Sequence, residues 1–184
     1  GMPQSLGPIG VYAPGRGTPA GDGNPVKGWN LLVTVLPMRD MTVLAELEHL
    51  GEFRRTSFKG VLTGWVEDIP WFLEAVQKAY ADRVRWALNI ARVLPMEQTF
   101  TFTPETFEDQ LKEAVSPFLS RMRSGTFYVR LERRGYRGKI HSPDVERAID
   151  AHVIIQGEQQ GKSLRVSFDD PDFIIAVETV APVC

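Results

Sequence analysis

The sequence predicts an α+β protein built from two small domains that follow a tail rich in glycine and proline. Three observations support this fold class. Strand and helix patterns alternate over residues 29–95, a second series of them runs over residues 96–184, and 13 of the first 28 residues are glycine or proline. A chain of 184 residues can hold two small domains, and its 43% apolar content is enough for a hydrophobic core.

Residues 1–28 are predicted to be a disordered tail. Glycine and proline leave this segment almost without aliphatic clusters. It therefore cannot bury enough apolar surface to offset the entropy that ordering would cost.

Residues 29–95 are predicted to form a ferredoxin-like domain with the element order βαββαβ. Two helices on one face of an antiparallel sheet are typical of this order. The elements are an apolar strand at 29–37, a helix at 40–50, a hairpin over 53–66 with its turn at Lys59-Gly60, a helix at 68–82 and a strand at 85–94. The second helix is expected to bury one stripe, comprising Trp71, Phe72, Ala75, Val76, Ala79 and Tyr80.

Residues 96–184 are predicted to form the second domain. A brief strand at 99–102 precedes a helix that Ser116-Pro117 should interrupt, because proline inside a helix costs about 3 kcal/mol. A strand begins at Gly125, with Phe127, Val129 and Leu131 on one face. A helix over 143–155 and two strands joined by a proline turn at 169–172 complete this domain.

The positive charges of the chain cluster in its second half. Residues 121–147 hold eight cations and three anions, a local net charge of +5, whereas the whole chain carries −2. Seven of these cations fall between Arg121 and Lys139, and we expect them to gather on one accessible surface. A local basic patch on an acidic body favours a polyanionic ligand such as nucleic acid, although a solvated strand and loop would have the same composition.

The candidate RNA-binding residues lie at the end of the strand and in the glycine-rich loop that follows it. Cations, a flexible backbone and a helix start at Ser142-Pro143 favour a bound phosphate there. Tyr136 is a candidate for stacking on an unpaired base, or it covers its own sheet, and His141 either contacts a phosphate or fixes the loop. The full set is Arg130, Arg133, Arg134, Tyr136, Arg137, Lys139, His141 and Ser142.

Other chemistry has little support in the sequence. The aspartates at 169, 170 and 172 are explained by the turn, and the three histidines lack the spacing of metal ligands, so no metal and no cofactor are expected. A single cysteine excludes an intrachain disulfide, and no apolar run approaches the ~20 residues that span a bilayer. Without a signal-peptide pattern, the expected compartment is the cytoplasm.

Several separated segments resemble the THUMP domain of tRNA-modifying enzymes. They are the strand Phe127-Tyr128-Val129-Arg130, the loop Arg134-Gly135-Tyr136-Arg137, the helix start at Ser142, the turn Phe168-Asp169-Asp170-Pro171-Asp172 and the strand end Val177-Glu178. The resemblance covers residues 96–184, and a ferredoxin-like unit often precedes this domain. It implies binding of tRNA near the acceptor stem and its 3′ end.

The resemblance also bears on catalysis. Enzymatic members of the family continue into a catalytic domain, whereas this sequence ends at Cys184. It is therefore similar to stand-alone members such as the tRNA cytidine acetylation adaptor, which implies a non-catalytic RNA-binding protein with a separate, acetyltransferase-like partner enzyme. The alternatives are an adaptor subunit without direct RNA contact, a small-molecule sensor built on the ferredoxin-like sheet, and an enzyme with scattered catalytic residues.

Overall fold

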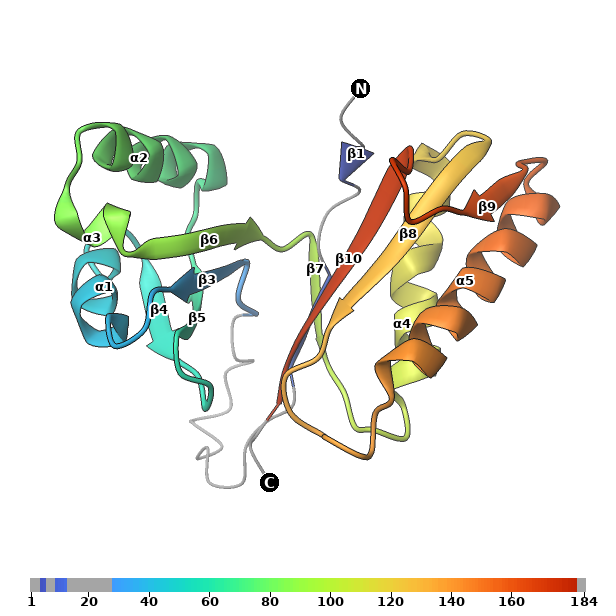
Figure 1. Ribbon diagram of the computed structural model, residues 1–184, viewed down its shortest axis with the longest axis horizontal. Coiled ribbons are helices and arrows are strands. Elements are labelled where there is room, and N and C mark those ends of the chain that lie inside the picture. Colours follow the sequence, from blue (N-terminus) through green and yellow to red (C-terminus); the bar gives the residue numbers. More distant parts are fainter. Residues whose placement is uncertain (1–3, 6–8, 13–27, 182–184) are drawn as a thin grey trace. The chain divides into compact units, whose positions relative to one another are not determined.

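The computed structural model describes residues 4–5, 9–12 and 28–181, which belong to two compact units (Figure 1). One unit spans residues 17–99, and the other combines residues 1–16 with residues 100–184. This is a mixed α/β architecture, as the sequence predicted.

The unit of residues 17–99 contains a four-stranded antiparallel sheet in the order β4-β5-β3-β6. Alternate residues of the central strand, Leu31, Val33 and Val35, belong to one buried cluster with residues of the first two helices, such as Val43 and Phe72. The elements are β3 (Leu31–Val35), α1 (Asp40–Leu47), β4 (Glu52–Arg55), β5 (Val61–Trp65), α2 (Ile69–Ala81), α3 (Arg85–Leu88) and β6 (Ile90–Pro95).

Helix α2 begins where the sequence predicted, because the Asp68 side chain accepts a hydrogen bond from the backbone N–H of Trp71. The predicted buried stripe is too wide, however. Of its six residues only Phe72 and Val76 are buried, whereas Trp71 is 52% and Tyr80 59% exposed. Adjacent helical residues point about 100° apart, so they cannot all face one sheet.

The segment predicted as a strand over 85–94 is a strand only in its second half. Its first residues form the short helix α3, and β6 begins at Ile90. Arg85, Trp86, Ala87 and Leu88 include no β-branched residue, so nothing local favours an extended chain over a helical turn there.

The other unit is built on a six-stranded sheet in the order β7-β2-β10-β8-β9, with β1 also pairing with β10. Strand β10 runs parallel to β1, β2 and β8, and β8 runs parallel to β9. The elements are β1 (Gln4–Ser5), β2 (Ile9–Tyr12), β7 (Gln98–Thr101), α4 (Phe107–Val115), the 3-10 helix η1 (Ser116–Arg121), β8 (Gly125–Glu132), α5 (Ser142–Gln159), β9 (Leu164–Val166) and β10 (Phe173–Val180).

One face of this sheet carries the core. Helices α4 and α5 lie on the same side of this sheet (Figure 1). Phe127, Val129 and Leu131 of β8 are buried in a cluster with residues of α4, η1 and α5, as the alternation in the sequence predicted. The helix break at Ser116-Pro117 is also confirmed, since α4 ends at Val115 and a 3-10 helix follows. This packing fixes β8, and therefore the point from which the basic loop departs.

The predicted disordered tail, residues 1–28, lies largely outside the described residues. Within it the structure differs from the prediction at β1 and β2, which pair with β10. Strand pairing satisfies backbone groups whatever the side chains are, so composition does not reveal it.

In the described ranges, no helix is both long enough and apolar enough to cross a bilayer. Among these same residues, no three histidine, cysteine, aspartate or glutamate side chains gather as metal ligands.

The carboxyl group of Asp150, on α5, has a raised pKa. Burial, together with the charge of Glu146 one turn away, raises the pKa of Asp150 to about 6. Its buried Oδ1 atom has no hydrogen-bond partner among the described residues.

This environment predicts a pH-dependent stability. The folded protein keeps a proton on Asp150 up to about pH 6, whereas the unfolded chain loses it near 3.8, so the free energy of unfolding should fall as the pH rises through this window. Asp150→Asn should remove that fall and stabilise the protein at neutral pH. Urea unfolding from pH 4 to 7 tests this, with Asp109→Asn on the exposed side of α4 as the control. Coinciding profiles for Asp150→Asn and wild type would contradict it.

Candidate nucleic-acid interface

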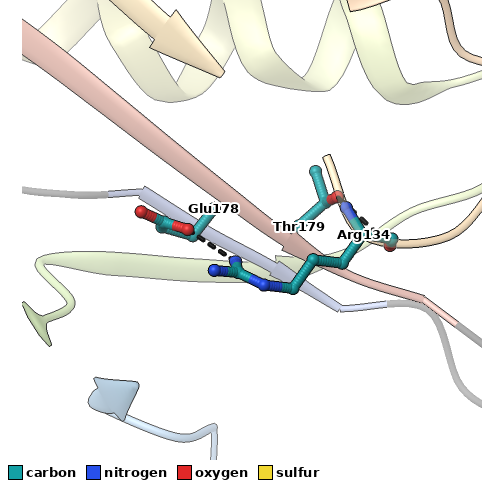
Figure 2. Close-up of polar contacts among 3 residues, drawn as sticks. All are labelled: Arg134, Glu178 and Thr179. Atoms are coloured by element: carbon teal, nitrogen blue, oxygen red, sulfur yellow. Dashed lines mark hydrogen bonds and ion pairs between the residues drawn. The ribbon is translucent and has the colours of Figure 1, made fainter. Parts of the chain in front are cut away.

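The basic loop, residues 133–139, connects the end of β8 to the start of α5. It passes beside the end of β10, and one arginine side chain joins the two (Figure 2). The Arg134 Nη1 atom lies 2.6 Å from the Glu178 Oε2 atom, and their side chains are 17% and 0% exposed. This pair is a largely buried ion pair rather than a surface contact.

The backbone of Arg134 is bound to the same strand. Its N–H donates to the Thr179 Oγ1 atom at 2.8 Å, and its carbonyl accepts from the backbone N–H of Ala181 at 3.1 Å. Figure 2 shows Glu178 and Thr179 approaching Arg134 from β10. Side chain and backbone together hold the loop in one position.

The next two residues need an unusual backbone. Gly135 has φ of 90°, and a Cβ atom there would lie 2.6 Å from the Ala181 Cβ atom, so only glycine fits. Tyr136 also has a positive φ, of 52°, and its ring packs edge-on against Phe102 with 5.7 Å between centroids. The tyrosine ring therefore anchors the loop to the core, and its stacking on a base stays a prediction.

Two cations of the loop point into solvent. The backbone N–H groups of Lys139 and Ile140 both donate to the Tyr136 carbonyl, and the Ile140 side chain is buried. Between these anchors, Arg137 and Lys139 are exposed and have no side-chain partner among the described residues. Arg133 is half-buried and donates to the Gly135 carbonyl at 2.6 Å.

Arg130 lies apart from the loop, on β8. It falls on the sheet face opposite the core, since it alternates with the buried Val129 and Leu131. Its side chain is half-buried, and its Nε atom has no hydrogen-bond partner in the part of the chain that the structure describes.

The helix start differs from the prediction by one residue. His141, not Ser142, is the N-cap of α5, and it makes no side-chain capping bond. The Asp144 carboxylate in the first turn lies 3.0 Å from the His141 Nδ1 atom and also pairs with Arg147. Arg147, and then His141, lower the pKa of Asp144, so a negative charge already faces the positive end of this helix.

The structure thus places the seven predicted cations at different positions before, along and after β8. Arg121 and Arg123 precede β8 and lie over the rings of Phe118 and Phe173, at 4.8 and 5.8 Å from the ring centroids. The basic loop follows β8, at the far end of an eight-residue strand that is about 26 Å long at ~3.3 Å per residue. The expectation that seven cations share one surface is therefore wrong, because the strand separates them and Glu178 neutralises Arg134.

Sequence reasoning missed the partners of Arg134. Glu178 and Thr179 are 44 and 45 residues away, so no local pattern connects them to the loop. A signal was nevertheless present, since the THUMP-like motif includes Val177-Glu178. An acidic residue at the end of a buried strand needs a cation, and the basic loop supplies it.

A parallel sheet, helices on one face and an anchored basic loop at the carboxyl end of a central strand define an α/β domain suited to binding an anion. Comparison with protein families identifies this part of the chain: the THUMP domain matches residues 105–184. The chain therefore contains a THUMP domain, as the loop and turn motifs indicated. THUMP domains are generally associated with RNA binding in tRNA modification. A comparison with curated proteins finds no match.

The ion pair of Arg134 predicts a large effect on stability. Arg134→Met leaves the buried Glu178 carboxylate without this cation, which should lower the free energy of unfolding by about 3–5 kcal/mol. Arg134→Lys keeps the charge without the planar fork and should lose less. Urea unfolding at neutral pH measures both. A loss below about 1 kcal/mol for Arg134→Met, as for an exposed pair, would contradict the structural role of this contact.

Proposed function

We propose that this protein binds tRNA near the acceptor stem and 3′ end through the basic loop, in support of tRNA modification and without catalysing the reaction itself. The observation that carries the proposal is the exposure of Arg137 and Lys139, without partners in the described residues, on a backbone that Arg134, Gly135 and Tyr136 fix. A preorganised loop binds more tightly because its ordering entropy is lost on folding, not on binding.

The remaining candidate contacts have different roles in this proposal. Arg133 and Arg130 are half-buried and add charge beside the loop and on the sheet face. Arg134 is mainly a positioning residue, since its guanidinium is paired with Glu178. His141 is exposed and Ser142 half-buried at the start of α5, where His141 contacts one oxygen of the Asp144 carboxylate and Arg147 contacts the other.

Recognition of the 3′ end rests on the THUMP domain and on general features of RNA binding. Proteins read RNA mainly through backbone shape and unpaired nucleotides, and a short loop with two exposed cations suits a single-stranded end better than a long duplex. A separate, acetyltransferase-like enzyme would then act on the bound tRNA, as the resemblance to the adaptor branch implies.

The unit of residues 17–99 is proposed to be ferredoxin-like. Its strand order, β4-β5-β3-β6, and its antiparallel pairing support this assignment, because the first and third strands lie at the centre. The short helix α3 is an addition to the βαββαβ order.

Charge reversal tests the loop directly. The double variant Arg137→Glu/Lys139→Glu should weaken binding of a tRNA transcript at least about tenfold, because two phosphate attractions become repulsions. The thermal midpoint should stay near that of wild type, since neither side chain has a partner in the described structure. Fluorescence anisotropy with transcripts that carry or lack the 3′ CCA measures both affinity and end preference.

The matched control is Lys59→Glu/Lys78→Glu, which reverses two exposed lysines of the other unit and changes the net charge equally. This variant should bind tRNA much like wild type. Equal weakening by both double variants would show that net charge, and not the basic loop, governs binding.

The salt dependence gives an independent measure of the same contacts. Removing the charges with Arg137→Gln/Lys139→Gln should reduce the slope of log affinity against log salt by about 1.4, at ~0.7 per phosphate contact on a single strand. Titrations from 50 to 300 mM KCl measure it. An unchanged slope would mean that these two side chains do not contact phosphates.

A further inference from the structure

A hollow of about 390 Å³ lies on the unit of residues 17–99, far along the chain from the basic loop. It forms where the turn from α1 into β4 meets the turn from β5 into α2. Its walls contain two tryptophans and three carboxylates, and no lysine or arginine lines it. The lining residues are Leu50, Gly51, Glu52, Trp65, Val66, Glu67, Asp68 and Trp71.

The aromatic part of the hollow is accessible. Trp71 is 52% exposed, although its helical spacing predicted burial, and Trp65 is half-buried. Trp65 is the cross-strand partner of Glu52 in the β4–β5 ladder, so an indole and a carboxylate stand side by side. Exposed tryptophan is enriched at the centres of protein interfaces, where its ring buries a large area.

The carboxylates are not neutralised within the unit. In the part of the chain that the structure describes, neither Glu52 nor Glu67 forms an ion pair. One oxygen of Asp68 accepts from the backbone N–H of Trp71 at 2.9 Å, which fixes this carboxylate at the start of α2, and both residues line the hollow. The hollow therefore has a negative potential and aromatic faces, and both attract a cation.

We propose that this hollow docks an arginine- or lysine-bearing segment of a partner protein. A guanidinium stacks on an indole face and at the same time donates hydrogen bonds to a neighbouring carboxylate, and the tryptophans and glutamates supply both. RNA does not fit, because its phosphates meet three carboxylates. The inference stands apart from the proposed function, since the hollow lies on the unit that does not contain the THUMP domain and would serve a second ligand.

A labelled hexa-arginine peptide is the probe, titrated into the full chain and followed by anisotropy. Wild type should bind it saturably. Glu52→Gln/Glu67→Gln, which keeps the shape and removes two charges, should weaken binding at least about tenfold, and so should Trp71→Ala. The charge-matched control is Glu46→Gln/Glu48→Gln. Both residues are exposed, Glu46 in the last turn of α1 and Glu48 directly after it, and this variant should bind the peptide as wild type does.

Three outcomes would overturn the proposal. The first is equal weakening by Glu52→Gln/Glu67→Gln and its control, which would mean attraction by net charge only. The second is spermine binding at least as tightly as the peptide, which would make the hollow a polyamine site. The third is loss of tRNA binding in Glu52→Gln/Glu67→Gln, which would make it an RNA contact. The peptide and spermine titrations contain no RNA, so a failure of the hollow in them is distinguishable from a failure of the basic loop. The third outcome applies when wild type binds tRNA.

Discussion

The ion pair between Arg134 and Glu178 is the contact on which the arrangement of the THUMP domain surface depends. It joins the end of the central strand β10 to the loop that leaves β8, and the backbone bonds to Thr179 and Ala181 strengthen the same junction. A largely buried carboxylate is unfavourable without a cation, so the pair restricts the loop to positions in which Arg134 reaches β10. The exposed cations that follow are then presented on a backbone with little freedom.

This junction separates the cations into two groups that the sequence does not distinguish. The Arg134 guanidinium is paired with Glu178 and holds the loop in place. Arg121 and Arg123 lie over aromatic rings at the opposite end of β8. The free charge available to a ligand is therefore smaller than a local net charge of +5 indicates. A surface with few phosphate contacts favours recognition by shape and by unpaired nucleotides over affinity for RNA in general.

The two units present surfaces of opposite chemistry. The THUMP domain has exposed cations on an anchored loop. In the unit of residues 17–99, exposed Trp71 and three carboxylates line a hollow that no lysine or arginine lines. Under the two proposals, one chain would bind a polyanion and a basic protein segment at different places, without either ligand competing for the other's charges.

The features that could be predicted from the sequence have local physical causes. The alternation of Phe127, Val129 and Leu131, the cap at Asp68 and the break at Pro117 depend on side-chain period and backbone sterics within a few residues. Tertiary packing was needed to show which cation is neutralised and which tryptophan stays exposed. Those outcomes depend on groups distant in the chain, such as the 44 residues between Arg134 and Glu178, and no local period encodes such contacts.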